Sequence, residues 1–119
     1  MILQLNHKQL DVWKKGVEFV TDIYKITDCF PKSEIYGLAS QIRRAAVSVA
    51  SNIAEGAARR SGIERKRFFE VARSSLVEID TQLVISMNLL YCSKDELRVI
   101  EEQMNHIFAM LSNLISKTK

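Results

Sequence analysis

Residues 41–60 of this chain read QIRRAAVSVASNIAEGAARR. The stretch predicts a helix that is unusually rich in small residues, which let helix backbones approach one another closely. Arginine pairs stand near its middle, Arg43-Arg44, and at its end, Arg59-Arg60, and arginines are rarely buried without a partner. We therefore expect a helix that packs tightly on one side and meets an anionic or polar partner on another.

Length and composition indicate one domain that spans residues 1–119. The chain is 47% hydrophobic and 26% charged, as soluble globular proteins are, and 119 residues can build one core but not two domains. Its start has no charged region followed by a long apolar stretch, so we expect no signal peptide. No run approaches the roughly 20 apolar residues of a membrane span. We expect a cytoplasmic protein that makes no membrane contact.

Apolar residues recur at steps of three and four along four segments, the spacing of one face of a helix. The first predicted helix runs from about Lys8 to Cys29, with Asn6 and Gln9 as a capping pair and Pro31 as its end. It carries two neighbouring apolar stripes, one of Leu10, Trp13, Val17, Val20, Tyr24 and Thr27, the other of Val12, Phe19, Ile23, Ile26 and Phe30.

Polar residues mark the starts of the other three helices. We expect Ser33 to cap the second helix, Ser61 with Glu64 to cap the third, and Ser93 with Glu96 to cap the fourth. The inward faces are Ile35, Leu38, Ile42, Ala45, Ala46, Val49 and Ile53 in the second helix, Phe69, Ala72, Leu76, Ile79, Leu83, Met87 and Leu90 in the third, and Leu97, Ile100, Met104, Ile107, Leu111 and Leu114 in the fourth.

Four long helices joined by short turns predict an all-α, antiparallel up-down-up-down four-helix bundle, a rod about 30 to 45 Å long. The first two helices are apolar around more of their circumference than a monomer needs, which favours self-association. The alternative interpretation is that the second helix is rich in alanine only because alanine is a good helix former.

Positive charge gathers around the turn between the second and third predicted helices. Residues 59–73 hold six cations and two carboxylates, a net of +4, which leaves −1 for the rest of a chain whose total is +3. Arg65, Lys66 and Arg67 fall in the first turn of the third helix, where the helix dipole favours acids over bases. Charge in an unfavourable place suggests a partner that carries phosphates, whereas a merely solvated surface is the alternative.

A polar stripe follows the second predicted helix. Glu55 precedes Arg59 by four residues, the spacing of an ion pair on a helix surface. The stripe is either a solvated face with an internal ion pair or a functional surface, and Asn52 beside it could face a subunit or a ligand. The whole stripe consists of Arg44, Ser48, Ser51, Glu55 and Arg59.

The sequence predicts no catalytic residue, metal site or cofactor. We interpret Cys29 and Cys92 as small core residues, since two cysteines are too few for a disulfide framework or a four-cysteine metal site. A di-iron bundle needs a glutamate three residues before each histidine, whereas His106 has Glu102 four residues before it and His7 stands near the start. No glycine-rich phosphate loop or nucleophile elbow is present. We therefore expect a protein that is not an enzyme.

Several strings of the sequence resemble the four-helix-bundle protein family of bacterial 23S rRNA intervening sequences. They include LDVWKK at residues 10–15, QIRRAA at 41–46 and SNIAEG at 51–56, and the resemblance covers about residues 8–92. It implies a homopentameric barrel of four-helix bundles whose basic surfaces meet nucleic acid. A related member is the accessory variability protein of diversity-generating retroelements. The resemblance therefore implies a shared architecture and does not assign a single function.

Two positions depart from the family pattern. Family members often carry proline where this chain has Ala50, so we expect a straighter second helix here. Gly16 stands where a helix former such as alanine is usual, at a cost of up to about 1 kcal/mol unless a close contact uses it.

Charge and resemblance together predict a non-enzymatic, oligomeric protein that binds RNA or DNA through phosphate contacts. The alternative is a protein-interaction scaffold or accessory subunit, whose arginines stabilise the oligomer or grip an acidic protein partner. The candidate nucleic-acid-binding residues are Arg43, Arg44, Arg59, Arg60, Arg65, Lys66 and Arg67.

Overall fold

The computed structural model describes residues 10–118, which contain helices and no strand. The elements are α1 (Asp11–Thr27), the 3-10 helix η2 (Lys32–Glu34), α2 (Leu38–Ala57), α3 (Gly62–Asn88) and α4 (Arg98–Lys117). The prediction of four helices is thus confirmed. The predicted capping pair of Asn6 and Gln9, and a helix start at Lys8, lie outside the described residues.

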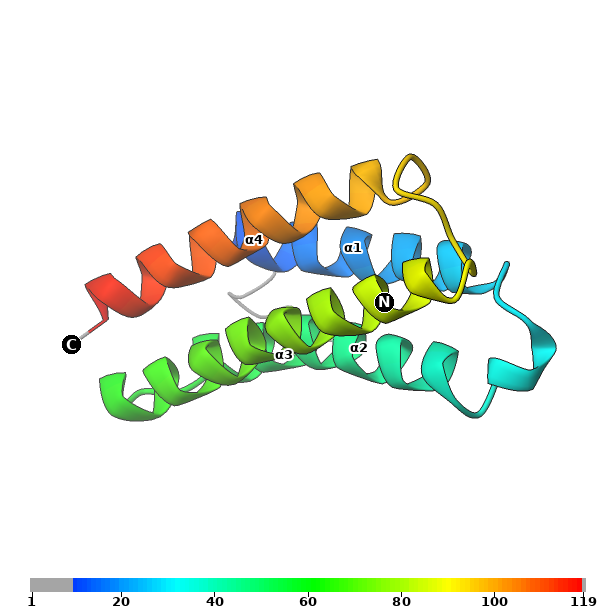
Figure 1. Cartoon of the computed structure of the whole chain (residues 1–119). Coiled ribbons are helices and arrows are strands. Elements are labelled where there is room, and N and C mark those ends of the chain that lie inside the picture. Colours follow the sequence, from blue (N-terminus) through cyan, green and yellow to red (C-terminus); the bar gives the residue numbers. More distant parts are fainter. Residues whose placement is uncertain (1–9, 119) are drawn as a thin grey trace.

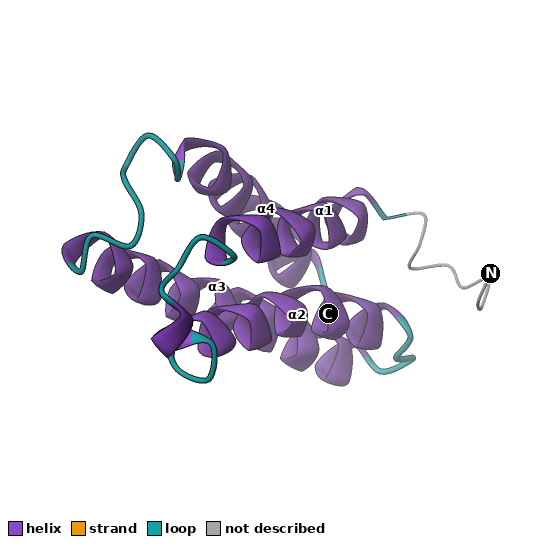
Figure 2. Cartoon of the chain, turned by 90° about the vertical axis from the view of Figure 1, so that its right-hand side faces the viewer, coloured by secondary structure: helices purple, strands orange, loops and turns teal. Residues whose placement is uncertain are grey.

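Each helix packs against the helix that follows it, and α4 packs back against α1 (Figure 1). The diagonal pairs, α1 with α3 and α2 with α4, make no close backbone approach within residues 10–118. The turned view shows the helices as two pairs, α1 with α4 above α2 with α3 (Figure 2). The described part of the chain measures 43 × 32 × 21 Å, which agrees with the predicted length of the rod.

The core is built from the predicted apolar faces. Phe19 and Ile23 of α1, Ile53 of α2, Ile79 of α3 and Ile107 of α4 are fully buried. Of the two stripes predicted for the first helix, the one that contains Phe19 and Ile23 faces the core. The other stripe stays partly exposed, with Val17 at 41% and Tyr24 at 44% exposure. Helix α1 therefore presents more apolar surface than this core uses.

Two glycines mark where α2 meets its neighbours. A Cβ atom on Gly56 would come within 2.8 Å of the Phe69 ring, so the close approach of α2 to α3 depends on glycine at this position. A Cβ atom on Gly16 would stand 3.5 Å from Ile53 Cδ1 and 3.7 Å from Ala50 Cα, which is ordinary van der Waals contact. The two positions that depart from the family pattern, Gly16 and Ala50, thus face each other across α1 and α2.

The predicted start of the second helix at Ser33 is wrong. Ser33 lies inside η2, and the side chain that caps α2 belongs to Glu34, whose Oε1 accepts a hydrogen bond of 2.9 Å from the Leu38 amide. A Cβ atom on Gly37 would come within 2.5 Å of this carboxylate, so glycine makes room for the cap. Ile35 was expected in the core but is exposed, because it precedes α2.

The predicted end of the first helix lies two residues too late. Helix α1 ends at Thr27 rather than near Cys29, because the amides of Cys29 and Phe30 bond to carbonyls three residues back and tighten the chain into a turn. Cys29 is consequently exposed, whereas Cys92 is buried, and burial raises the pKa of the Cys92 thiol.

Leu90 was expected in the core but is 89% exposed. Helix α3 ends at Asn88, and Leu90 takes the left-handed conformation with φ 64°. The amides of Leu90 and Tyr91 bond to the carbonyls of Met87 and Ser86, which is the hydrogen-bond pattern of a Schellman motif. This reversal of the chain turns the Leu90 side chain away from the bundle.

The predicted cap at Ser61 is confirmed, whereas Ser93 forms its predicted pair with Glu96 but does not cap α4, whose N-cap residue is Leu97. Ser61 Oγ accepts a hydrogen bond of 3.4 Å from the Glu64 amide at the start of α3. Ser93 and Glu96 bond reciprocally, each side chain accepting from the amide of the other residue at 3.2 and 2.9 Å. The second pair closes a turn over residues 94–97, and α4 begins after it at Arg98.

Candidate nucleic-acid interface

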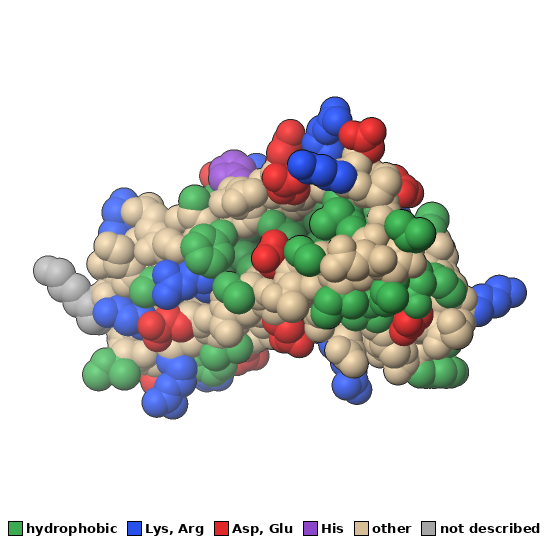
Figure 3. Space-filling view, viewed as in Figure 1, with side chains coloured by type: hydrophobic (Ala, Val, Ile, Leu, Met, Phe, Trp, Pro, Cys, Tyr) green, Lys and Arg blue, Asp and Glu red, His purple; other side chains and the backbone are tan. Residues whose placement is uncertain are grey.

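The structure divides the seven predicted cations into two groups. Arg59, Arg60, Arg65, Lys66 and Arg67 surround the junction of α2 and α3, and we call these five residues the basic turn. Arg43 and Arg44 lie in the first half of α2, about 22 Å away along the helix at 1.5 Å per residue. The space-filling view shows Lys and Arg side chains gathered at the end of the molecule where α2 meets α3 (Figure 3).

Arg43 is occupied by contacts with the C-terminal end of α1. Its Nε donates a hydrogen bond of 2.8 Å to Thr27 Oγ1, and one terminal nitrogen donates to the Tyr24 carbonyl at 3.2 Å. The same nitrogen lies 3.4 Å from an oxygen of Asp28, and the guanidinium carbon stands 4.7 Å from the centre of the Tyr24 ring. A cation at a helix C-terminus is favoured by the helix dipole. Arg43 therefore joins α1 to α2.

Arg59 forms the ion pair that its spacing predicts. One terminal nitrogen lies 2.7 Å from Glu55 Oε2, and the guanidinium carbon stands 4.8 Å from the centre of the Phe68 ring. Its Nε is shielded from solvent and has no hydrogen-bond partner. Stacked on α3 and paired with α2, Arg59 is fixed in place with part of its charge already balanced.

Arg65 crosses the turn. Its terminal nitrogen donates a hydrogen bond of 3.2 Å to the Arg60 carbonyl, while its Nε is shielded and has no partner. The backbone of the loop thus holds one of the three cations that begin α3. This contact fixes the shape of the loop in which Arg60 lies.

Arg60, Lys66 and Arg67 remain available to a ligand. None of the three side chains makes a hydrogen bond or ion pair within residues 10–118, and Arg60 and Arg67 are exposed while Lys66 is partly exposed. Arg44 is likewise exposed on α2. The basic turn therefore presents three uncompensated positive charges on one loop and the helical turn that follows it.

Arg73, which contributes to the predicted local charge, is turned toward α4. Its Nη1 donates a hydrogen bond of 3.2 Å to Ser112 Oγ, and its guanidinium carbon stands 5.8 Å from the centre of the Phe108 ring. Arg73 therefore acts between helices and does not extend the basic turn.

The polar stripe on α2 is partly internal. Ser48 and Ser75 share a hydrogen bond of 3.0 Å between their hydroxyl oxygens, which connects α2 to α3. Asn52 Nδ2 donates to the Ser48 carbonyl at 2.8 Å and to Ser48 Oγ at 2.9 Å. Asn52 is therefore bonded within its own helix, to the serine that meets α3, and its side chain stays partly exposed.

Other kinds of site receive little support from the described residues. No three side chains of His, Cys, Asp and Glu between residues 10 and 118 are grouped so that they could hold a metal ion. None of the helices in this range is long and apolar enough to cross a membrane. His106 is exposed on α4 beside a shallow cavity of about 200 Å³, which it lines with Lys15, Glu18 and Glu102.

Comparison with known proteins agrees with this architecture. A sequence model of the family described as 23S rRNA-intervening sequence protein matches residues 8–113. A crystal structure of a protein with unknown function from the S23 ribosomal protein family of Bacteroides thetaiotaomicron VPI-5482 is similar, with a TM-score of 0.82 and 20% identity. The alignment covers 89% of this chain and 96% of that one. No curated protein matches the chain.

Proposed function

The chain belongs to the 23S rRNA-intervening sequence protein family, and we propose that it is a non-enzymatic, oligomeric protein that binds RNA or DNA. The protein binds the phosphates, and its main binding residues are Arg60, Lys66 and Arg67 of the basic turn. The observation that carries the proposal is the presence of three accessible cations without partners, held on a loop that Arg59 and Arg65 fix in place.

Cations without a partner inside the chain gain the most from contact with phosphates. Cations that are paired within a protein gain little from meeting a phosphate, whereas unpaired ones release the counterions condensed on the nucleic acid. Arg43 is the cation of the predicted set most fully used inside the chain, so we assign it to stability and not to binding. Arg44 is exposed but stands apart from the basic turn, and we assign it a secondary phosphate contact.

We further propose that the chain is an up-down-up-down bundle that assembles into a cytoplasmic homopentameric ring. The packing of successive helices and of α1 against α4 supports this topology. The partly exposed apolar stripe of α1 supports the assembly. A ring would repeat the basic turn once per copy, and several weak sites on one rigid body bind a long polyanion far more tightly than one site does.

Charge reversal at the basic turn tests the proposal. The variant with Arg60→Glu and Arg67→Glu is compared by fluorescence anisotropy with a control that carries Lys32→Glu and Arg98→Glu. Both variants change the net charge by the same amount, but Lys32 lies in η2 and Arg98 begins α4, at the other end of the molecule (Figure 1). We expect the first variant to lose at least tenfold in affinity for structured RNA or duplex DNA at 50 mM salt, and the control to lose much less.

The scaffold alternative predicts a different result. If the arginines stabilise the oligomer or grip an acidic protein, wild-type protein binds no nucleic acid at 50 mM salt, and charge reversal changes the assembly instead. Light scattering on the same samples reports the assembly. Equal losses in both variants would also contradict the assignment, because they would show attraction by net charge without a defined site.

A further inference from the structure

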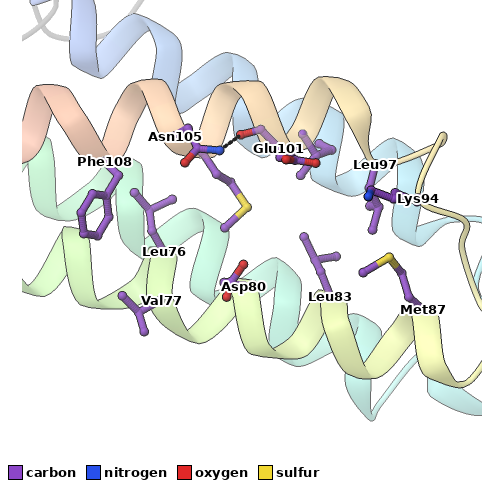
Figure 4. Close-up of a pocket in the computed structure, with 12 residues that line it drawn as sticks. Leu76, Val77, Asp80, Leu83, Met87, Lys94, Leu97, Glu101, Asn105 and Phe108 are labelled. Carbon is purple, nitrogen blue, oxygen red and sulfur yellow. Dashed lines mark hydrogen bonds between the residues drawn. The ribbon is translucent and has the colours of Figure 1, made fainter.

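A groove runs between α3 and α4 on the face of the molecule seen in Figure 3, where hydrophobic side chains line a hollow. Its volume is about 560 Å³. The close-up shows the side chains of Leu83 and Met87 of α3 directed toward α4, and the Asp80 side chain lies between the two helices (Figure 4). On the opposite wall stands Glu101, and Lys94 lies at one end. The groove is therefore apolar along its length and carries a net charge of −1.

The lips of this groove are apolar as well. Val77 of α3 is 56% exposed and Phe108 of α4 is 40% exposed, although both line the groove. Exposed apolar residues beside an apolar groove are typical of a surface that another protein covers.

Helix α1 carries a surface of complementary character. Lys14, Val17, Thr21, Tyr24 and Lys25 recur at helical spacing on its outer face, and we call them the α1 stripe. All five are exposed, even though the Arg43 guanidinium covers one side of the Tyr24 ring. The stripe places Val17, Thr21 and Tyr24 between two lysines, with the exposed carboxylate of Glu18 beside it.

The two surfaces agree in length and charge. The stripe spans 12 residues from Lys14 to Lys25, and the α3 wall of the groove spans 12 residues from Leu76 to Met87, so each is about 16 Å long. The lysines of the stripe match the carboxylates Asp80 and Glu101 of the groove. A single chain cannot bring the two together, since α1 and α3 make no close approach.

We propose that the α1 stripe of one copy packs into the α3–α4 groove of a second copy. This inference rests on the proposed oligomer and specifies the contact between neighbouring copies, which we call the joint. The two halves of such a joint are different surfaces of the same chain, so the contact is head-to-tail and leaves one stripe and one groove free on every pair. Head-to-tail contacts close into a ring when the rotation between copies permits it.

Complementation between two variants tests the joint. Val17→Glu places a charge in the stripe and Val77→Glu places one at the groove, while Val99→Glu, on an exposed face of α4 outside both surfaces, is the control. We expect light scattering to show one chain per particle for each of the first two variants, and the wild-type mass for the control. A 1:1 mixture of the two monomeric variants should form a species of two chains, because one intact stripe can enter one intact groove.

Each other outcome overturns a specific statement. If both variants keep the wild-type mass, or if the mixture stays monomeric, the joint is wrong while the oligomer stands. If the wild-type protein is itself a monomer, the proposed assembly fails as well. Circular dichroism checks that the variants keep their helices.

A second pair of variants avoids any change in packing. Lys14→Glu with Lys25→Glu reverses the charge of the stripe, and Asp80→Lys with Glu101→Lys reverses that of the groove. Each double variant should shift the assembly toward monomers, because its own stripe and groove then carry like charges. Mixing the two should restore contacts between unlike copies, because the stripe of each variant is opposite in charge to the groove of the other. Combining all four substitutions in one chain should restore the assembly, and failure of that restoration would contradict the charge match.

Discussion

The Nε atom of Arg43 donates a hydrogen bond of 2.8 Å to Thr27 Oγ1, which in turn donates one of 2.7 Å to the Ile23 carbonyl. Thr27 is buried, so this chain of bonds satisfies a hydroxyl inside the bundle and connects the middle of α2 to the end of α1. The arginine pair at residues 43 and 44 is therefore divided, with one residue directed to the core of the chain and the other to its surface.

Arg43→Ala should lower the free energy of unfolding by about 1–3 kcal/mol, because hydrogen bonds from a charged donor and a ring contact are lost together. Chemical denaturation measures this loss. Arg44→Ala is the matched control, and as an exposed substitution it should change the stability by less than about 0.5 kcal/mol. Affinity for nucleic acid should change less than twofold with Arg43→Ala, and a larger loss in a folded variant would return Arg43 to the binding site.

Gly16→Ala should stabilise the protein by up to about 1 kcal/mol, since alanine is the better helix former and its Cβ would meet Ile53 and Ala50 at ordinary contact distances. The control is Gly56→Ala, whose Cβ would stand 2.8 Å from the buried Phe69 ring. This second substitution should destabilise by about 1–3 kcal/mol through overpacking. Thermal unfolding compares the two, and a destabilising Gly16→Ala would show that α1 and α2 tolerate no added atom there.

The cap of α2 should make stability depend on pH. The Leu38 amide and the Tyr91 hydroxyl, at 2.9 and 2.8 Å, lower the pKa of Glu34 below its ordinary value of 4.5. A carboxyl group whose pKa is lowered by folding stabilises the fold at pH values above 4.5, and this contribution is lost as the pH falls through the lowered pKa.

Glu34→Gln tests this linkage. The wild-type protein should unfold at a higher temperature than the variant at pH 7, and the difference should shrink as the pH falls below 4.5 and Glu34 takes up its proton. A difference that stays constant over this range would mean that the charge of Glu34 contributes nothing to the cap.

Local signals in the sequence predicted the helices well, because their causes lie within a few residues. The hydrogen bonds of Ser61 and Ser93 depend on a partner three residues away, and both form, although the second closes a turn before α4 and does not cap it. The prediction for the start of α2 was wrong because the residue that caps this helix is held by a distant part of the chain. Its cap comes from Glu34, whose other oxygen is held by Tyr91, 57 residues further along the chain.

In the candidate site too, the sequence predicted local contacts but not those that depend on how the helices pack. The ion pair of Glu55 and Arg59 follows from helical spacing and is confirmed. The separation of Arg43 from its neighbour Arg44 depends on which side of α2 meets α1, which spacing alone leaves open. The groove between α3 and α4 gave no sequence signal, since Leu83 and Met104 read as core positions whether or not the two helices close over them.

The dependence of nucleic-acid affinity on salt tests the central claim most directly. Fluorescence anisotropy with wild-type protein at several salt concentrations between 50 and 200 mM gives the slope of log affinity against log salt. If each of five copies neutralises two phosphates, the slope should be near −9, and the charge-reversed basic turn should flatten it. Binding that does not change with salt, or a slope equally steep in the charge-reversed variant, would contradict the claim that the basic turn binds phosphates.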